Sequence, residues 1–397
     1  MPLSNSDTLS MVNPLSLAII VPTYCEAENL PILLQRIREV MQPTGRSYEV
    51  VVVDDNSPDN TPQVCDELVS NGHPLRLLVR KDERGLSSAV LHGMNNAREA
   101  DILLCMDADL SHPAEALPSM CEALEEHPDV EFVIGSRYVK GGSTDENWGA
   151  FRWLNSKVAT ALARPFTKVK DPMAGFFALP ERVYRRAENL NPCGYKIGLE
   201  LLVKCRCREV AEVPIHFQDR LYGESKLTFK EQWNYIRHIK RLFDFKYGSL
   251  AQLGQFLMVG ASGMIIDLLM MSILLAASLP VAGARAIAIF TAMTWNFYFN
   301  RRITFSRTRK EKILSQYARF IATCSLGAGI NWGISVSLAH SNDFFATYPI
   351  LAAILGIIGG TFSNFLISKF WVFRHRKPSD KTENQRSAEN LGRPTAS

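Results

Sequence analysis

Two aspartates one residue apart carry the clearest chemical signal in the sequence. Asp107 and Asp109 stand in the stretch CMDADLS, directly after the apolar run Ile102–Leu104. A short apolar run bounded by polar residues predicts a buried strand, and side chains two residues apart on a strand share one face. Two carboxylates held close together repel each other unless a proton or a cation lies between them, and Mg²⁺ or Mn²⁺ prefers such oxygen ligands. The pair therefore predicts a divalent-metal site, although the same spacing also occurs in exposed turns.

Further polar clusters end the other predicted strands of the first half. The strand candidates are LAIIV at 17–21, YEVVVV at 48–53, LRLLVR at 75–80, DILLCMDAD at 101–109 and VEFVIGSRY at 130–138. Helical patterns lie between most of them, which predicts an open, mainly parallel α/β sheet of Rossmann-like type with helices on both faces. Ligands of such sheets bind outside the carboxyl ends of the strands. One binding site is expected at that edge, although turn chemistry alone would explain each cluster singly. The clusters are Pro22-Thr23-Tyr24, Asp54-Asp55-Asn56, Gly85 and the aspartate pair.

The composition excludes some classes of function. A net charge of +4 on 397 residues is too small to indicate nucleic-acid binding, and the chain is too apolar to be disordered. Its eight cysteines include no C-x-x-C pair, and the closest two are Cys205 and Cys207. No signal-peptide pattern stands at the start, so reduced thiols in a cytoplasmic domain are expected.

The chain changes character after about residue 245. Four long apolar stretches follow, at about 250–279, 281–299, 320–340 and 347–372, with short polar joints between them. About 20 apolar residues cross a bilayer as a helix, and four such stretches in a row are not expected of a soluble core. This half is therefore predicted to be an all-α domain of four transmembrane helices.

Positive charge predicts how these helices cross the membrane. Lys and Arg gather before the first stretch, between the second and third, and after the fourth, whereas the opposite loops carry almost none. The positive-inside rule then puts both termini and the polar half in the cytoplasm. Residues 233–248 interleave apolar and basic residues at helical spacing, which favours a helix lying on an anionic leaflet, although its first half also fits a core helix. The polar tail after Lys377 is expected to be disordered.

The apolar half repeats itself. NFYFNRRITF at 296–305 matches NFLISKFWVF at 364–373, and QFLMVGASGMIID at 255–267 matches RFIATCSLGAGIN at 319–331. Each repeat would be one in-out-in hairpin, so an axis along the membrane normal is expected to relate the two. Gly356 and Gly360 would allow close helix contact. Asp267, with Asn331 as its repeat partner, is the costliest residue to place in a membrane, and either a functional role or a structural hydrogen bond fits it.

Seven segments of the polar half resemble a known family. They are VPTYCEAENL, VVDDNSPDNT, RGLSSAV, MDADLSHP, GSRYVKGG, KDPMAGFFAL and GESKL, in this order, within residues 17–235. These motifs are similar to those of the dolichol-phosphate mannosyltransferases, inverting polyprenyl-phosphate glycosyltransferases of family 2 with the GT-A fold. The apolar half resembles a GtrA-type four-helix domain. Together they imply a flexible N-terminus at 1–16, a GT-A domain at 17–230, an interfacial amphipathic segment at 231–248, a transmembrane domain at 249–375 and a disordered tail at 376–397.

The resemblance implies a donor site at the predicted edge. Mg²⁺ or Mn²⁺ would be held by Asp107, Asp109 and Ser111, at whose position family members carry Gln or Ser. Such a metal neutralises the diphosphate of a nucleotide sugar as the anomeric bond breaks. Cys25 stands where Asn is common in the family. The positions that bind the nucleotide sugar map to Pro22, Tyr24, Glu26, Asp54, Asp55, Gly85, Leu86, Asp107, Asp109, Arg220 and Lys226.

The implied acceptor is a polyprenyl phosphate, which is already an anion. It needs a cationic cradle behind the anomeric carbon rather than a strong general base. Arg137, Arg152 and Ser156 match the family's lipid-phosphate positions, and the planar fork of arginine binds phosphate oxygens bidentately. Surface arginines, however, are usually solvated or weakly paired. The catalytic residues implied are Asp107, Asp109, Arg137 and Arg220.

The hypothesis from the sequence is an integral membrane enzyme that transfers mannose from GDP-mannose to a polyprenyl phosphate by one in-line displacement, giving a β-linked product. UDP-glucose or a UDP-hexosamine with undecaprenyl phosphate is the nearest alternative, and KDPMAGFFAL and GESKL favour the mannosyl branch. A lipid-linked-sugar flippase with an inactive transferase domain is an alternative of a different class, since transporters are often built from repeats. A processive polysaccharide synthase is disfavoured because no Q-x-x-R-W motif follows the catalytic core.

Overall fold

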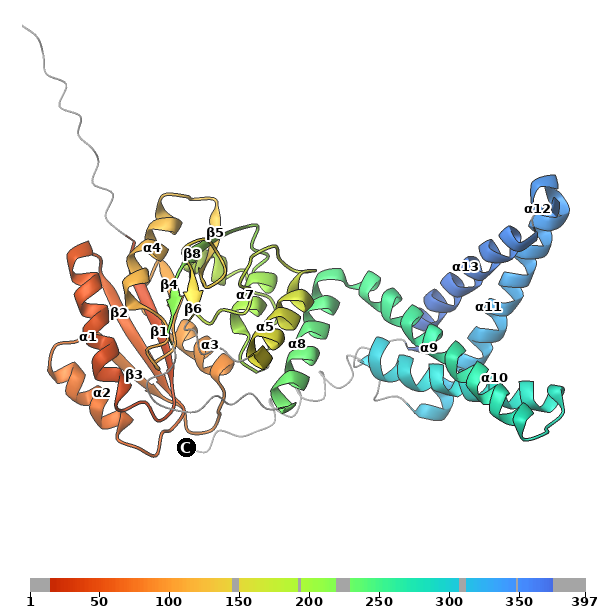
Figure 1. The fold of residues 1–397 in the computed structure, drawn as a ribbon, viewed down its shortest axis with the longest axis horizontal. Coiled ribbons are helices and arrows are strands. Elements are labelled where there is room, and N and C mark those ends of the chain that lie inside the picture. The colour runs from red at the N-terminus through yellow and green to blue at the C-terminus, as the bar shows by residue number, and fades with distance from the viewer. Residues whose placement is uncertain are drawn as a thin grey trace, which may run out of the picture. The chain divides into compact units, whose positions relative to one another are not determined.

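The chain forms two compact units, Met1–Lys246 and Tyr247–Ser397 (Figure 1). The structure, a computed structural model, describes residues 15–144, 150–191, 194–218, 229–306, 312–347 and 349–373. The first unit is built from strands and helices, whereas the described part of the second is helical. The predicted α/β half followed by a helical half is therefore confirmed.

A seven-stranded sheet forms the centre of the first unit, in the order β3-β2-β1-β4-β7-β5-β8. The pairs β1–β2, β1–β4, β2–β3 and β5–β8 are parallel, and only β7 runs antiparallel to its neighbours β4 and β5. The sheet is thus mainly parallel, as predicted. Its strands are β1 (Leu17–Thr23), β2 (Tyr48–Asp54), β3 (Leu75–Val79), β4 (Ile102–Cys105), β5 (Val130–Ser136), β7 (Phe177–Pro180) and β8 (Glu209–Pro214).

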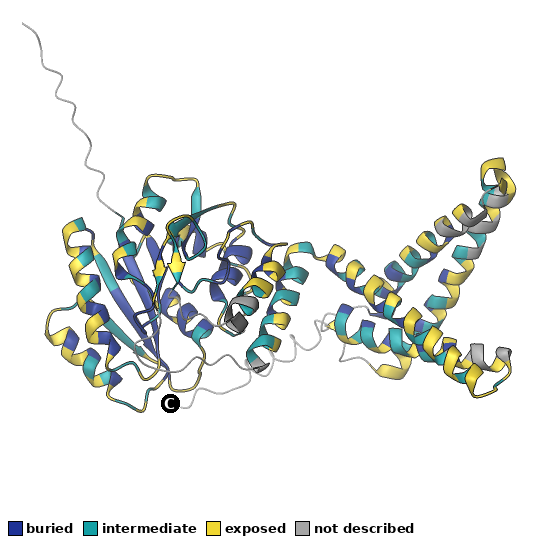
Figure 2. Cartoon of the chain, in the orientation of Figure 1, coloured by how far each residue is buried: buried dark blue, intermediate teal, exposed yellow. Residues whose placement is uncertain are grey.

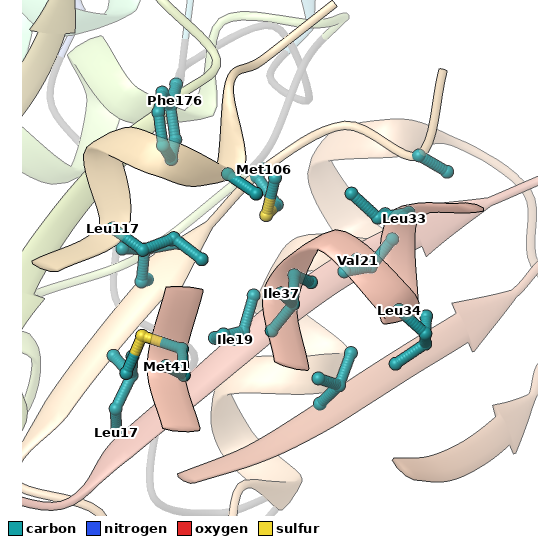
Figure 3. Close-up of a cluster of buried hydrophobic side chains, with 14 of the residues drawn as sticks. Leu17, Ile19, Val21, Leu33, Leu34, Ile37, Met41, Met106, Leu117 and Phe176 are labelled. Atoms are coloured by element: carbon teal, nitrogen blue, oxygen red, sulfur yellow. The ribbon is translucent and has the colours of Figure 1, made fainter. Parts of the chain in front are cut away.

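Helices cover both faces of this sheet. Each of the first four strands leads into a helix: α1 (Asn29–Met41), α2 (Thr61–Ser70), α3 (Leu86–Asn96) and α4 (Leu117–Glu125). The odd-numbered residues of β1 join one apolar cluster with α1 and α4, in which Ile19, Ile37 and Leu117 are fully buried (Figure 3). On the opposite face, a Cβ at Gly93 of α3 would lie 2.6 Å from Ile20 Cγ2, so only glycine lets α3 approach so closely. Burial on both faces explains why β1 and β2 are nearly continuous aliphatic runs.

The remaining elements of the first unit lie beyond β5. They are β6 (Ser143–Thr144), which pairs in parallel with β9 (His216–Phe217), and the helices α5 (Ala150–Ala163), α6 (Glu181–Tyr184), α7 (Ile197–Lys204) and α8 (Phe229–Tyr247). Helix α8 packs along α5, because the Tyr235 hydroxyl donates to the Ala159 carbonyl at 2.7 Å and the Phe166 and Phe243 rings meet edge to face.

The second unit contains α9 (Ser249–Ala276), α10 (Val281–Phe299), α11 (Ile313–Ser341), α12 (Asp343–Thr347) and α13 (Pro349–Ile367). Two helical stretches among its described residues, Ser249–Ala276 and Leu355–Val372, are long and apolar enough to cross a membrane. The predicted count of four spans is not confirmed, because only these two stretches of the described residues meet that criterion. Large apolar side chains such as Met258 and Ile273 are more than 60% exposed, which suits a lipid environment (Figure 2).

The same packing recurs in both sequence repeats of the second unit. A Cβ at Gly263 would collide with Asn296 Oδ1, and a Cβ at the equivalent Gly327 would collide with Asn364 Oδ1. Both second helices end in one π-helical turn, Asn300–Thr304 and Ser368–Val372. The residues that follow these turns, Phe305 and Phe373, stack with ring centroids 4.5 Å apart.

Candidate functional site

The aspartate pair lies in the loop that follows β4. The strand ends at Cys105, so the expectation that both aspartates continue a strand is wrong. The backbone leaves the sheet after Met106, whose N–H still donates to the Ile20 carbonyl, and reaches the left-handed region at Leu110, where φ is 65°. Asp109 is 6% exposed, and its Oδ1 accepts hydrogen bonds from the Ser111 backbone N–H at 3.2 Å and the Ser111 hydroxyl at 2.6 Å. The turn itself, rather than strand alternation, brings the oxygens of Asp109 and Ser111 together.

His112 organises the other aspartate. Its Nδ1 accepts a hydrogen bond from the Asp107 backbone N–H at 2.9 Å, and its Nε2 lies 3.9 Å from Asp107 Oδ2. The ring stacks on Phe176, and burial lowers the pKa of His112, with Asp107 and Asp109 acting in the opposite sense. A neutral imidazole that accepts at Nδ1 thus fixes the loop carrying the Asp107 carboxylate, a quarter of which stays exposed.

This donor set fits a hard divalent cation. It consists of carboxylate and hydroxyl oxygens, which Mg²⁺ and Mn²⁺ prefer. Among the residues that the structure describes, no group of three or more His, Cys, Asp and Glu side chains gathers at one place.

Asp54 ties together the loops that follow β1 and β2. Its carboxylate accepts hydrogen bonds from the Ser57 N–H at 3.0 Å and the Ser57 hydroxyl at 2.5 Å, and Ser57 Oγ in turn accepts from the Cys25 N–H at 2.8 Å. Cys25 has φ of 60°, a left-handed conformation that Asn adopts readily. The family's common Asn at this position therefore has a backbone explanation.

Asp55 and Arg80 form a buried pair that fixes the loop at the start of α3. Arg80 donates to Asp55 Oδ1 from Nε at 2.7 Å and from Nη2 at 2.5 Å, and both residues are less than 8% exposed. The second oxygen of Asp55 accepts from the Gly85 N–H at 2.7 Å, and Arg80 also donates to the Gly85 carbonyl at 3.1 Å. Gly85 has φ of 142°, which favours glycine. Asp55 thus positions Gly85 and Leu86.

The segment at the end of β1 is more exposed to solvent than the Asp55–Arg80 pair. Pro22 lies inside β1, paired with Val53, and the Tyr24 ring that follows is 39% exposed with the Arg84 guanidinium 5.0 Å from its centroid. Glu26 accepts from the Asn29 side chain at 2.6 Å at the start of α1. An exposed aromatic face and nearby carboxylates offer stacking and hydrogen-bond acceptors to a nucleoside.

Arg137 at the end of β5 is held by Asp171. Its Nε and Nη2 donate to the two carboxylate oxygens at 2.7 and 2.8 Å, and Asp171 is fully buried. The guanidinium also lies over the Tyr138 and Phe217 rings, at 5.3 and 5.2 Å from their centroids. Arg137 is therefore a fixed cation and not a solvated surface arginine. The Tyr138 hydroxyl forms a hydrogen bond of 2.8 Å with Ser156 on α5.

Lys196, which precedes α7, is a second cation near Arg137. Its Nζ lies 3.4 Å from the Met173 carbonyl. Burial lowers the pKa of Lys196, Arg137 lowers it further, and Asp171 and Asp107 raise it, so these charges lie near one another. Three of the predicted cations cannot be added to this picture: Arg220 and Lys226 lie outside the described residues, and only the backbone of Arg152 is described, within α5.

Except for Ser156 on α5, the structure therefore places the described candidates at or just beyond the carboxyl ends of β1, β2, β3, β4 and β5. Sequence reasoning missed Arg80, His112, Asp171 and Lys196. His112 and Asp171 stand inside the segments MDADLSHP and KDPMAGFFAL, so the motifs contained them. Arg80 and Lys196 gave no signal of their own, because their importance comes from side chains distant in the sequence.

Two family descriptions match the chain. Residues 18–187 match glycosyl transferase family 2, and residues 255–373 match the GtrA/DPMS transmembrane domain. A dolichol-phosphate mannosyltransferase from Pyrococcus furiosus is 38% identical over 348 residues, which cover 87% of this chain and 95% of that protein. One of the same name from Saccharomyces cerevisiae is 40% identical over 240 residues, 58% of this chain and 88% of that protein.

Solved structures match part of the chain more distantly. Mannosyl-3-phosphoglycerate synthase from Rubrobacter xylanophilus is 19% identical with a TM-score of 0.46, covering 57% of this chain and 73% of that one. Glucosyl-3-phosphoglycerate synthase from Mycobacterium tuberculosis, solved with Mn²⁺, uridine diphosphate and phosphoglyceric acid, is 16% identical with a TM-score of 0.45, covering 59% and 79%.

Proposed function

Because the chain belongs to the dolichol-phosphate mannosyltransferases, we propose that it transfers mannose from GDP-mannose to a polyprenyl phosphate at the cytoplasmic face of a membrane. The observation that carries this proposal is the match to the Pyrococcus furiosus enzyme, which spans both units and 95% of that protein. The geometry supports it, since two carboxylates and two partly buried cations lie at one edge of a mainly parallel sheet.

The donor would bind over the ends of β1, β2 and β3. Tyr24 offers its ring to the base, and Glu26 and Asp54 offer acceptors to base N–H groups or ribose hydroxyls. The Asp55–Arg80 pair holds Gly85 so that backbone can approach the nucleotide closely. Arg220 and Lys226 are proposed to contact the nucleotide sugar as well.

Asp107, Asp109 and Ser111 would hold Mg²⁺ or Mn²⁺, which supplies Lewis-acid neutralisation of the diphosphate leaving group. The chain prepares this set before any donor arrives. Asp109 is bonded to Ser111, and His112 fixes the backbone of Asp107, so binding needs little reorganisation of these side chains.

The acceptor phosphate would lie by Arg137, with Arg152 and Ser156 beside it. Asp171 locks the Arg137 fork in one orientation, which lowers the entropy lost when it binds phosphate oxygens. One phosphate oxygen attacks the anomeric carbon while the bond from that carbon to the diphosphate breaks, and GDP leaves with the electron pair. Because attack comes from the side opposite the leaving group, the product is β-linked. No proton has to be removed from the nucleophile.

We also propose that α9, α10, α11 and α13 all cross the membrane, with both termini and the first unit on the cytoplasmic side. The length of α10 and α11 and the distribution of Lys and Arg support this arrangement. A flippase with an inactive first unit is disfavoured, since Asp107, Asp109 and Arg137 are all present and held by specific partners.

Donor binding tests the sugar and the nucleotide separately from turnover. The detergent-solubilised protein with Mg²⁺ is titrated with GDP-mannose and with UDP-glucose in a calorimeter. We expect GDP-mannose to bind at least about tenfold more tightly. Tighter binding of UDP-glucose would keep the site and replace the mannosyl donor by the nearest alternative.

A further inference from the structure

We propose that Cys205 and Cys207 are a redox-active pair, which small anionic disulfides such as oxidised glutathione convert reversibly into an internal disulfide. The pair lies near the amino ends of β5 and β8, at the edge of the sheet opposite the candidate site. The proposal does not depend on which sugar is transferred. Reduced thiols remain the resting form, as expected in a reducing compartment.

The turn at the end of α7 folds the two cysteines toward each other. Cys205 caps the helix with φ of −78°, and Arg206 is left-handed with φ of 55°. The Arg206 N–H donates to the Val203 carbonyl at 3.2 Å, and the Cys207 N–H donates to the Leu202 carbonyl at 3.1 Å. These two hydrogen bonds form a Schellman motif, which closes the helix and holds the left-handed residue in place. The spacing between the two cysteines is therefore fixed by the backbone.

Within this turn the two thiols are hydrogen-bonded to each other. A disulfide needs Cα atoms within about 7 Å, and an extended chain already separates residues two apart by up to about 7 Å, so a folded turn favours the bond. Cys205 is buried, whereas Cys207 is partly exposed. The pair thus has one sulfur open to a reagent and a second beside it that can complete the disulfide.

The hydrogen bond also makes the two thiols differ in acidity. Cys207 lowers the pKa of Cys205, burial and Glu131 raise it, and Arg186 lowers it, so that the pKa of Cys205 lies below its usual value. The hydrogen bond with Cys205 and burial raise the pKa of Cys207. Because the thiolate is the form that attacks a disulfide, a pair that loses its first proton more readily is more reactive.

A cavity of about 480 Å³ adjoins the pair, a volume typical of small-molecule sites. Three arginines and two glutamates line it beside Cys205, which leaves one net positive charge. Oxidised glutathione is a net anion, so this charge favours its approach. The lining residues are Glu131, Arg186, Glu188, Cys205, Arg206 and Arg208.

The exchange with glutathione disulfide balances in two steps. With Cys205 ionised, the Cys207 proton passes to the Cys205 sulfur, and the Cys207 thiolate attacks one sulfur of glutathione disulfide and expels a glutathione thiolate. That thiolate takes the proton from Cys205, whose sulfur then attacks Cys207 and expels the second glutathione, which takes a proton from water. The two protein sulfurs lose two electrons, and the glutathione disulfide gains them and becomes two thiols.

Oxidation of the full chain in defined glutathione buffers tests the pair. The detergent-solubilised protein is equilibrated with reduced and oxidised glutathione, free thiols are blocked with N-ethylmaleimide, and Glu-C protease releases residues 201–209, LLVKCRCRE. We expect this peptide to be unblocked and two hydrogens lighter, and dithiothreitol to reverse the change. The equilibrium constant for disulfide formation should be at least about tenfold higher in the protein than in a synthetic LLVKCRCRE peptide, because the turn prearranges the sulfurs.

Equal equilibrium constants for the protein and the peptide would overturn the proposal. Glutathione held on Cys207 with no internal disulfide would also overturn it, because Cys205 would then be unable to complete the exchange. Cys207→Ser should give no internal disulfide in residues 201–209. None of these readouts uses glycosyl transfer, so their failure would leave the proposed function untouched.

The charge of the cavity gives a second readout. Arg186→Gln removes a cation from the lining and should slow oxidation by glutathione disulfide about three- to tenfold. Arg185→Gln, at the neighbouring exposed arginine that pairs with Glu181, is the matched control and should leave the rate unchanged. With the neutral 2-hydroxyethyl disulfide, the effect of Arg186→Gln should be smaller. Equal slowing by the two variants, or with the two reagents, would contradict the preference for an anionic disulfide.

Discussion

The two units of this protein use polar side chains in opposite ways. In the first, charged residues form specific pairs at one edge of an aliphatic core, and each pair occurs once: Asp109 with Ser111, Asp55 with Arg80 and Asp171 with Arg137. In the second, two equivalent glycines, Gly263 and Gly327, lie against the carboxamides of Asn296 and Asn364, so the same contact occurs twice. Single-copy polar pairs are expected where chemistry is done, and duplicated small-residue contacts where helices must approach each other. A substitution in the second unit therefore has an internal counterpart, whereas one at the edge of the sheet has none.

The largest effect is expected at the aspartate pair. Asp109→Ala removes a buried carboxylate and leaves the Ser111 hydroxyl without its partner, so transfer should fall by about 10²–10³-fold. Chelation of divalent ions by EDTA should cause a similar loss, restored by added Mg²⁺ or Mn²⁺. Asp66→Ala, which removes an exposed carboxylate on α2, should leave both the transfer rate and its dependence on divalent ions unchanged. Full activity of Asp109→Ala would contradict this view of the first unit, because the contact between Asp109 and Ser111 would then be dispensable.

Asp171 should be the most important edge residue for stability. Asp171→Ala removes the carboxylate that pairs with the Arg137 guanidinium, whose side chain is only 11% exposed. The loss should lower the free energy of unfolding by about 3–5 kcal/mol. Glu181→Ala removes only the exposed pair with Arg185 and should cost less than about 1 kcal/mol. Thermal unfolding of the detergent-solubilised protein measures both, and equal shifts would show that burial of the edge pairs contributes nothing.

Whether a contact can be predicted from the sequence depends on how many residues separate its two partners. The five leading strands, the helices between them and the carboxyl edge follow from hydrophobic runs and turn residues, which are local signals. The strand prediction for Asp107 and Asp109 is wrong because the last sheet hydrogen bond is that of Met106. After it, the His112 and Ser111 side chains form the hydrogen bonds of these two residues. The partners of Arg137 and Asp55 stand 34 and 25 residues away, and no local pattern reports such pairs.

The duplicated contacts of the second unit should respond alike. A Cβ at Gly263 or Gly327 would meet the carboxamide of Asn296 or Asn364, so each Gly→Ala variant should lower stability by about 1–3 kcal/mol. Gly260→Ala, where no atom lies within 4 Å, is the matched control and should be neutral. Asn296→Ala should restore the stability of Gly263→Ala, and donor binding should be unaffected throughout. A loss at one glycine alone would contradict the equivalence of the two repeats.

The smallest effect should come from His238, a buried histidine on α8. Burial lowers the pKa of His238 below its usual 6.5, with Lys204 and Arg241 acting in the same sense and Glu200 against it. The unfolded chain then takes up a proton below about pH 6.5 that the folded chain does not, so stability falls as the pH decreases from there. His238→Gln should reduce this loss of stability by about 1 kcal/mol or less. His92→Gln, at an exposed position, should not reduce it. Thermal unfolding between pH 7.5 and pH 5 measures the difference, and an unchanged slope in His238→Gln would show that another group is responsible.

The lipid product itself shows whether this protein transfers mannose to a polyprenyl phosphate. The purified full-length protein is incubated with a polyprenyl phosphate and Mg²⁺, with GDP-mannose or UDP-glucose in parallel, and the lipid product is isolated for mass analysis and assignment of the anomeric configuration. We expect β-linked polyprenyl-phosphate mannose from GDP-mannose, formed about 10²–10³-fold more slowly by Asp109→Ala. Absence of any glycolipid product from protein that binds the nucleotide sugar would contradict it.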